Sequence, residues 1–347
     1  YRNIHDCQLL KDIFPSECSE MNTLVGLFII ALTQSDLSNV SFRLLSLERP
    51  KEPEIEIIGT EVTEEDEKDA WTDEFGVKYS KDGKKLLRST HYSLKNYTIR
   101  KGTRCICDRA FAGNFNSCPS LQSVTIPDSV TSIGDNAFSW CTSLQSVTIP
   151  DSATSIGDWA FEYCSSLQSV TIPDSVTSIG DGAFYDCWSL QSVTIPESAT
   201  NIKGNTFLAC PAKVINHSNH FTIFEGNLYT SDRRKLISYL SKGENFIIPD
   251  SVTSIDDHAF ESCKSLLSVT IPDSVTSIGD HAFESCKSLQ SVTIPDSVTS
   301  IGYRAFCRCE SLQSVTIPDS VTRIGFDVFQ GCSSLQSVTI SHKHTTD

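Results

Sequence analysis

From Cys118 to Ile340, hydrophobic and polar positions repeat every 23 residues, with one interruption over residues 211–245. The first complete unit reads CPSLQSVTIPDSVTSIGDNAFSW, and its cysteine returns at Cys118, Cys141, Cys164, Cys187, Cys263, Cys286, Cys309 and Cys332. A unit of this length cannot bury its own apolar side, so neighbouring units must stack around a shared core. The period therefore predicts a solenoid.

The segment SLQSVTIP alternates in the manner of a strand. Leu121, Val124 and Ile126 are predicted to point inward, while Ser123 and Thr125 point outward. Because each unit presents the same segment, stacking predicts a parallel sheet with one column of serines and one of threonines on its outer side.

The rest of the unit predicts a turn, a second short strand and a helical turn. Pro127 ends the first strand, and Val130 and Ile133 supply a second inward pair. Gly134 suits a backbone bend of positive φ. The apolar residues of the segment 137–141 are spaced so that one turn of helix would face the core.

The recurring pattern C-x-x-L-x-x-V-x-I-P-x-x-V-x-x-I-G-x-x-A-F resembles the 23-residue bacterial class of leucine-rich repeats, called BspA-like, from Tyr97 to Ile340. This resemblance implies a curved, right-handed α/β solenoid with a parallel inner sheet and short helices outside. BspA-like proteins are associated with cell surfaces, coaggregation and adhesion to host matrix proteins such as fibronectin and fibrinogen. The resemblance thus implies a non-enzymatic binding protein on the cell surface or secreted.

A second, rarer repeat interrupts the first. FGVKYSKDGKKLL (Phe75–Leu87) matches EGNLYTSDRRKLI (Glu225–Ile237), and each copy predicts a β-hairpin insert. The expected organisation is a non-repeat N-terminal module 1–74, a hairpin insert 75–96, a first repeat block 97–210, a second insert 211–245, a second repeat block 246–340 and a tail 341–347.

The segment 1–74 does not repeat. Apolar spacing predicts helices over residues 4–14 and 21–32, and strands over 39–47 and 54–62. Together they suggest a small α+β cap that covers the first coil, and a dimerisation or anchoring module is the alternative.

Charge and hydropathy limit the classes of partner that the chain can bind. The formal net charge of −15 argues against nucleic acid, because phosphates require a basic surface. The longest apolar run, Leu24–Leu32, is too short for a bilayer, which takes about 20 residues. The chain begins at Tyr1 and not at Met, which is compatible with a removed targeting peptide.

Fourteen cysteines would suggest a disulfide framework in a small secreted domain. Eight of them hold the repeat position given above and Cys210 holds the ninth, so these are expected to be buried free thiols. The sequence is compatible with either a disulfide or two free thiols at Cys7/Cys18 and at Cys105/Cys107.

Catalysis requires unlike residues that converge on one point, whereas repetition supplies identical residues in rows. The chain contains no GxSxG, HExxH, P-loop or paired CxxC motif. We therefore predict no catalytic, cofactor-binding or metal-binding residues. His258 and His281 share a repeat position and could bind a metal together with Cys263 and Cys286. Those two thiols should face the core while the histidines lie outside, so a metal site is the weaker interpretation.

The copies differ most around the predicted helical turn. This variation predicts a partner-binding edge there. Six aromatic residues replace small or charged ones there: Trp140, Trp159, Tyr163, Tyr185, Trp188 and Tyr303. The expected partner is a protein. The alternative is that each ring merely packs over its neighbour.

Three further interpretations remain open from the sequence. The serine and threonine columns are similar to ice-binding or crystal-binding arrays. Each PDSV turn is similar to an Asp-Ser-aliphatic acceptor for O-glycosylation. The abundant thiols also fit an intracellular protein-interaction scaffold, or a structural protein whose specificity lies in the N-terminal module.

Overall fold

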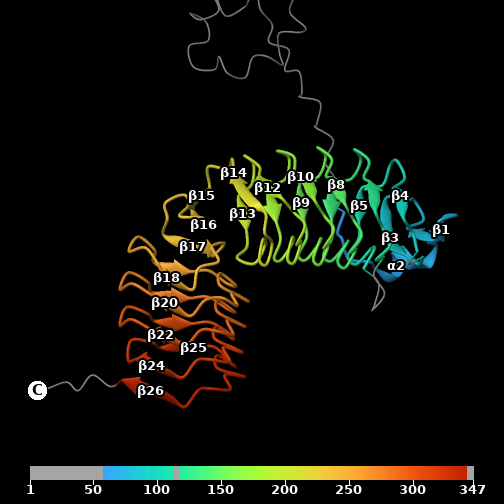
Figure 1. The fold of residues 1–347 in the computed structure, drawn as a ribbon. Helices are drawn as coiled ribbons and strands as arrows, with labels where there is room; N and C mark the ends of the chain where they lie inside the picture. Colours follow the sequence, from blue (N-terminus) through green and yellow to red (C-terminus); the bar gives the residue numbers. More distant parts are fainter. Residues whose placement is uncertain (1–57, 92, 113–117, 342–347) are drawn as a thin grey trace, which may run out of the picture. The chain divides into compact units, whose positions relative to one another are not determined.

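The computed structural model describes residues 58–91, 93–112 and 118–341, and all of them belong to one compact unit that begins at Ile57. In this unit the chain winds into coils that lie side by side (Figure 1). The helices expected over residues 4–14 and 21–32, the strand expected over 39–47, the Cys7/Cys18 pair and the end of the tail lie outside the described residues. The strand expected over 54–62 is wrong in its described part, because residues 58–62 form a bend and irregular backbone. No helix in the described part is long and apolar enough to cross a membrane.

The first strand of each coil builds parallel sheets whose exposed side carries hydroxyl groups, as predicted. In β6 (Ser123–Thr125), Ser123 and Thr125 are exposed and Val124 is buried. The strands at this position are β4 (Asn96–Thr98), β6, β8 (Ser146–Thr148), β10 (Ser169–Thr171), β12 (Ser192–Ile195), β14 (Lys213–Asn216), β18 (Asn245–Ile247), β20 (Ser268–Thr270), β22 (Ser291–Thr293), β24 (Ser314–Pro318) and β26 (Ser337–Ser341). They pair in the orders β4–β6–β8–β10, β12–β14 and β18–β20–β22–β24–β26. We call their exposed side the hydroxyl face.

A second ladder consists mostly of two-residue strands whose second residue is buried. Its parallel members are β5 (Cys105–Ile106), β7 (Ser132–Ile133), β9 (Ser155–Ile156), β11 (Ser178–Ile179), β13 (Asn201–Ile202), β19 (Ser254–Ile255), β21 (Ser277–Ile278), β23 (Ser300–Ile301) and β25 (Arg323–Ile324). Ile133 lies opposite Ile156, and Ser132 opposite Ser155. Because the period is constant, equal positions face one another across each pair, and a slip by one residue would expose every isoleucine.

The predicted short helices are wrong. After Gly134 the chain makes consecutive turns in which alternate N–H groups reach the next coil: Phe138 N–H donates to the Ala160 carbonyl, and Trp140 N–H to that of Glu162, both at 2.8 Å. Trp140 adopts a left-handed φ of 61°. The turns thus form a third ladder between coils, which satisfies the backbone groups that a helix would satisfy internally. The one described α-helix, α2 (Glu64–Lys68), lies outside the repeats.

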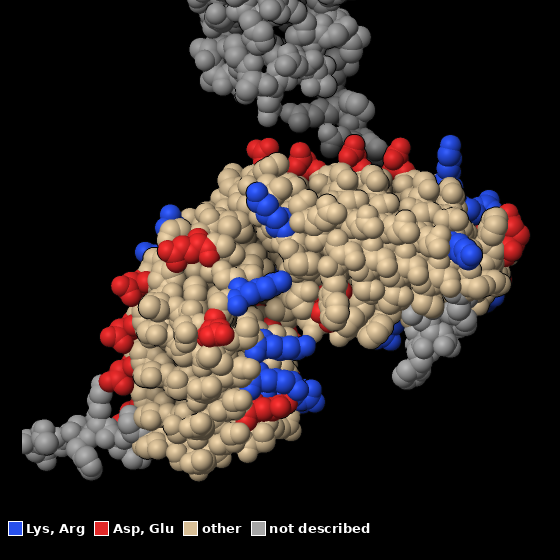
Figure 2. Space-filling model, in the orientation of Figure 1, with Lys and Arg blue, Asp and Glu red and all other residues tan. Residues whose placement is uncertain are grey.

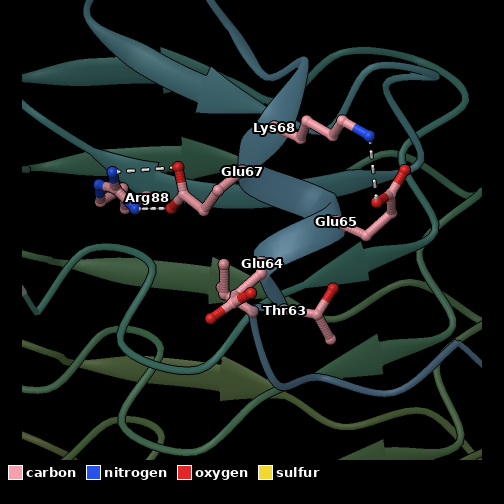
Figure 3. A pocket seen from close by; sticks show the side chains of 7 residues that line it. Thr63, Glu64, Glu65, Glu67, Lys68 and Arg88 are labelled. Carbon is pink, nitrogen blue, oxygen red and sulfur yellow. Dashed lines mark hydrogen bonds and ion pairs between the residues drawn. The ribbon is translucent and has the colours of Figure 1, made fainter.

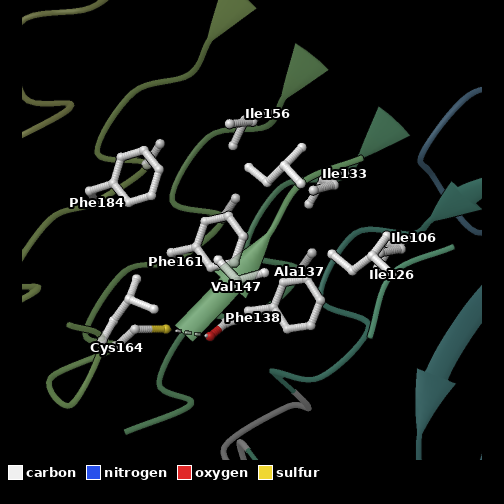
Figure 4. Close-up of a cluster of buried hydrophobic side chains, with 14 of the residues drawn as sticks. Ile106, Ile126, Ile133, Ala137, Phe138, Val147, Ile156, Phe161, Cys164 and Phe184 are labelled. Atoms are coloured by element: carbon white, nitrogen blue, oxygen red, sulfur yellow. Dashed lines mark hydrogen bonds between the residues drawn. The ribbon is translucent and has the colours of Figure 1, made fainter. Parts of the chain in front are cut away.

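Stacked phenylalanines occupy the core of each block of coils (Figure 4). Phe138 and Phe161 lie 5.2 Å apart and nearly parallel, and Phe161 and Phe184 follow at 5.5 Å. All three are fully buried, which contributes about 1.5–3 kcal/mol for each ring. A second stack, with 5.0 Å between Phe283 and Phe306, belongs to a separate buried cluster.

The repeat cysteines are free thiols that face the core or its margin, as predicted. Cys164 Sγ donates to the Phe138 carbonyl at 3.2 Å, and Cys286 Sγ donates to the Phe260 carbonyl at 2.9 Å. Burial raises the pKa of both thiols well above the usual range. Cys105 and Cys107 are also free and buried.

Gly134 is required for a reason other than the one expected, because its φ is not in the left-handed region. A Cβ there would lie 2.4 Å from Asp108 Oδ1 and 2.7 Å from the Asp108 backbone nitrogen. The glycine therefore admits an aspartate ladder between coils, in which the Asp158 N–H donates to Asp135 Oδ1 at 2.8 Å. The same glycine position in other coils meets the same obstacle.

The two rarer segments do pair as hairpins, but neither is an insert that leaves the array. β2 (Val77–Tyr79) pairs antiparallel with β3 (Lys85–Ser89), and β16 (Asn227–Thr230) pairs antiparallel with β17 (Lys235–Ser238). Each second strand then continues in parallel, β3 beside β5 and β17 beside β19. The hairpins therefore begin the second ladder of each block, with β1 (Trp71–Thr72) and β15 (Phe221–Phe224) added at the outer edges.

Residues 58–74 cover the start of the first block. Ile58, Val62 and Ala70 pack against Leu87, Cys105 and Cys107. Lys85 Nζ binds Asp66 Oδ2 at 2.7 Å, and the capping box of Thr63 and Asp66 fixes the start of α2. These contacts exclude water from one side of β3 and β5.

Candidate functional site

The turn ladder brings five of the six predicted aromatic residues together. We call this group the aromatic edge: Trp140, Trp159, Tyr163, Tyr185 and Trp188. Trp140, Trp159 and Tyr163 have φ values of 61°, 57° and 53°. Backbone bonds between coils hold these left-handed residues in place, for example from Tyr163 N–H to the Tyr185 carbonyl at 2.9 Å.

Ring contacts run across three successive coils. Trp140 stacks on Tyr163 with 4.0 Å between ring centroids, and Tyr163 meets Tyr185 edge-on at 5.6 Å. Trp159 also meets Tyr185 at 5.6 Å. Such pairs contribute about 0.5–1.5 kcal/mol beyond the area that they bury. Most rings of the group therefore pack on a neighbouring ring.

Two of the tryptophans nevertheless keep much of their surface in solvent. Trp140 is 48% exposed and Trp188 is 66% exposed. Trp188 Nε1 donates to Asp186 Oδ1 at 2.9 Å, and Asp186 itself is buried. Because a buried carboxylate fixes the indole, Trp188 presents its ring to solvent in one orientation.

A second carboxylate lies within the same group. Glu162 Oε2 accepts a hydrogen bond of 2.8 Å from Ser139 Oγ. Burial raises the pKa of Glu162, and the charge of Asp186 adds to that rise. Burial and the neighbouring acidic groups also raise the pKa of Tyr163. The aromatic edge is thus acidic as well as apolar.

Tyr303, the sixth predicted residue, lies apart from this group. Its ring meets His281 edge-on at 5.1 Å, and the Arg304 guanidinium lies 5.0 Å from its centroid. It takes the repeat position of the laddered aspartates, and its N–H donates to Asp280 Oδ1 at 2.6 Å.

His258 and His281 contact each other and two glutamates, and not the repeat cysteines Cys263 and Cys286. His258 and His281 stack at 4.7 Å, and His258 Nδ1 bonds to Glu261 Oε2 at 2.7 Å. Burial opposes protonation of His258, but Glu261 with Asp181 and Asp257 raises its pKa. Among the described residues no three potential metal ligands come together.

The hydroxyl face is less uniform than its sequence pattern suggested. Lys213 and Ile215 of β14 replace the serine and threonine, and Ile247 of β18 replaces a threonine. Ile247 is 72% exposed and Ile215 is 37% exposed. Sequence reasoning missed them because it compared only regular copies. Aligning the irregular strands with the repeat would have revealed these substitutions.

Acidic and basic residues are unevenly distributed along the chain. No Lys, Arg or His occurs from residue 118 to residue 202, a stretch that contains nine Asp and Glu residues. The aspartates of the PDS turns, such as Asp128 and Asp151, are exposed. In Figure 2 acidic side chains follow one another along the outline of the coils, and Lys and Arg gather elsewhere on this face.

Comparison with known proteins places this array in a family. A model of the BspA type leucine rich repeat region matches residues 112–236 and 233–346. The chain belongs to the BspA-type leucine-rich repeat family. A leucine rich cell surface protein from Faecalibacterium prausnitzii A2-165 is 34% identical over 75% of this chain and 77% of its own, with a TM-score of 0.58.

The family fold extends to more distant structures. The pneumococcal vaccine antigen PcpA is 20% identical over 79% of this chain and 82% of its own, with a TM-score of 0.61. Its similarity concerns the fold alone. None of the curated proteins compared matches the chain.

Two grooves in this BspA-type array are lined by residues that do not form a recognisable catalytic or ligand-binding group. One, of about 850 Å³, lies beside α2 and is lined by Val62, Thr63, Glu64, Glu65, Glu67, Lys68 and Arg88 (Figure 3). The other, of about 490 Å³, is lined by Gly279, Gly302 and Gly325, which directly follow β21, β23 and β25, and it also reaches the exposed Phe326. In the first groove the Glu67 carboxylate is bound by Arg88, so the ion pair is structural.

Most serine hydroxyls of the PDS turns face the preceding coil. Ser152 Oγ donates to the Val130 carbonyl at 2.5 Å, and Ser274 Oγ donates to that of Val252 at 2.7 Å. A glycan on these oxygens would break bonds between coils. The structure therefore argues against O-glycosylation of these two serines in the folded protein.

Proposed function

We propose that this protein is a non-enzymatic binding protein, displayed on the cell surface or secreted, that holds a protein partner on its aromatic edge. The observation that carries the proposal is that Trp140 and Trp188 are exposed yet fixed by ring and carboxylate contacts. Fixed aromatic side chains contribute large contact areas at a low entropic cost.

The second block lacks this feature, which makes the edge specific to one part of the array. The residues equivalent to Trp140 there are Ser262, Ser285, Arg308 and Gly331, and those equivalent to Trp188 are Lys264, Lys287, Glu310 and Ser333. A purely structural need for these rings would apply to both blocks. The difference between them supports a binding role.

Surface display is supported by the family relationship. The Faecalibacterium prausnitzii relative is described as a leucine rich cell surface protein. For this chain we propose the same location, and adhesion to a host matrix protein such as fibronectin or fibrinogen as the biological role.

The test is binding of the purified protein to immobilised fibronectin and fibrinogen by biolayer interferometry. We expect the Trp140→Ala/Trp159→Ala/Trp188→Ala variant to bind about 30-fold more weakly, because loss of a central aromatic residue typically costs about 2 kcal/mol or more. Far-UV circular dichroism checks that the variant remains folded.

A matched control comes from an exposed ring outside the edge. Phe326 is 86% exposed, and Phe326→Ala is expected to bind as the wild type does. Unchanged binding by the folded triple variant would remove the aromatic edge from the proposal. Failure of the wild type to bind either matrix protein would reject the proposed adhesion role.

A further inference from the structure

We infer that the aromatic edge recognises a basic segment of its protein partner, in which an arginine side chain lies against Trp140 or Trp188 and donates hydrogen bonds to the nearby carboxylates. This inference rests on the proposed function and adds the chemistry of the partner. It follows from three features of the edge: the acidic charge of its coils, the carboxylates that have no cationic partner, and the exposed ring surface.

The coils that carry the edge contain charged residues of one sign. The nine acidic residues between positions 118 and 202 have no basic residue among them. By contrast, residues 203–245 contain six Lys and Arg against three Asp and Glu. A partner surface that approaches the edge therefore meets a negative field, which favours a cationic segment and repels an acidic one.

The two carboxylates within the edge have no cationic partner. Glu162 is held by Ser139, and Asp186 by Trp188. Among the described residues, neither Glu162 nor Asp186 takes part in an ion pair. Both groups are desolvated, so a guanidinium placed beside them would gain charge-assisted hydrogen bonds.

The rings supply a second attraction to the same cation. A planar guanidinium can stack on an aromatic face while its N–H groups, which point outward in its own plane, bind nearby carboxylates; a lysine ammonium cannot do this. The chain already uses this contact elsewhere: Arg100 lies 4.7 Å from the Trp71 ring centroid, and Arg233 lies 4.2 Å from that of Phe224. The aromatic edge offers rings and carboxylates without an arginine of its own.

The experiment uses the whole protein and three synthetic dodecapeptides that alternate glycine with arginine, lysine or glutamate. Isothermal titration calorimetry at 50 and 150 mM NaCl measures each affinity. We expect the arginine peptide to bind more tightly than the lysine peptide, and the glutamate peptide not to bind. Trp140→Ala/Trp188→Ala should weaken arginine-peptide binding about tenfold at 150 mM NaCl.

A matched pair of charge variants separates the site from the general acidity of the chain. Glu162→Gln removes one charge inside the edge, and Asp273→Asn removes one exposed charge in the second block. We expect the first to weaken arginine-peptide binding several-fold and the second to leave it within twofold.

Four results would overturn the inference. Equal affinity for the arginine and lysine peptides, unchanged by loss of the tryptophans, would mean nonspecific charge attraction. Displacement by a neutral oligosaccharide at lower concentration would assign the edge to sugars. Concentration-dependent dimers lost on Lys264→Glu/Lys287→Glu would assign it to a second copy. If matrix-protein binding depends on the tryptophans but the arginine peptide does not compete, the proposed function stands and this inference fails.

Discussion

The two hairpins provide a matched pair of buried tyrosines with different hydrogen bonding. In the first, Tyr79 OH lies 2.5 Å from Tyr97 OH, which donates to Asp73 Oδ2 at 2.6 Å. Because the Tyr97 proton is used on the carboxylate, Tyr79 is the donor to Tyr97. The Arg100 N–H lies 3.4 Å from the Tyr79 oxygen. Tyr79 is fully buried.

In the second hairpin the equivalent Tyr229 has lost this partner. Phe246 stands at the position of Tyr97, so no second hydroxyl is present. Asn227 lies near the Tyr229 hydroxyl, but the buried oxygen forms no hydrogen bond. Tyr229 is as deeply buried as Tyr79.

The same substitution should therefore act in opposite directions. Tyr79→Phe removes one strong hydrogen bond and leaves the Arg100 N–H without its acceptor, which should lower the free energy of unfolding by about 1–2 kcal/mol. Tyr229→Phe removes a buried hydroxyl that has no partner, so its effect should lie between zero and a stabilisation of about 1 kcal/mol.

Urea unfolding measures both variants. The four tryptophans, Trp71, Trp140, Trp159 and Trp188, all precede the second hairpin, so their fluorescence reports the first block, whereas far-UV circular dichroism reports both. We expect Tyr79→Phe to lower the midpoint of the fluorescence transition. Tyr229→Phe should leave that midpoint unchanged and should keep or raise the midpoint of the second-block transition that only circular dichroism reports. An equal loss of stability in the two variants would refute the hydrogen-bond explanation and point to packing of the ring.

Three other predictions test local features. Gly182→Ala should destabilise the first block by about 2–4 kcal/mol, because its Cβ would lie 2.2 Å from the Trp159 ring; in a Trp159→Ala background the cost should fall to about 1 kcal/mol, and an unchanged cost would exclude the clash. Iodoacetamide should label the partly exposed Cys263 before the buried Cys286 in native protein, as read by peptide mass spectrometry; equal rates would contradict the burial. Hydrogen bonds from two basic side chains lower the pKa of Glu67, so its stabilisation is present above its ordinary pKa of 4.5 and is lost as the pH falls through the lower folded value; the difference in urea stability between wild type and Glu67→Gln should therefore be smaller at pH 3 than at pH 7, and a constant difference would count against the ion pair.

The hydrophobic period was sufficient to predict the stacked coils, the parallel sheet and the buried thiols. A strict repeat places the same side chain at the same depth in every coil, so inward positions such as Val124 and Phe138 can be read from spacing alone. The local conformation after Gly134 could not be read in this way. A helical turn and a ladder of turns both bury Phe138, and only hydrogen bonds between coils distinguish them.

The aromatic edge shows the same division. The sequence alone determined which positions vary between copies, and it placed five aromatic residues in neighbouring coils. Tertiary structure decided which of them meet, because Trp188 joins the group through Asp186 and Tyr303 does not join at all. The period of a solenoid fixes how far apart two residues lie along the array, but side-chain direction within a coil depends on φ, which here turns left-handed at pairs of residues four positions apart, such as Asn136 and Trp140.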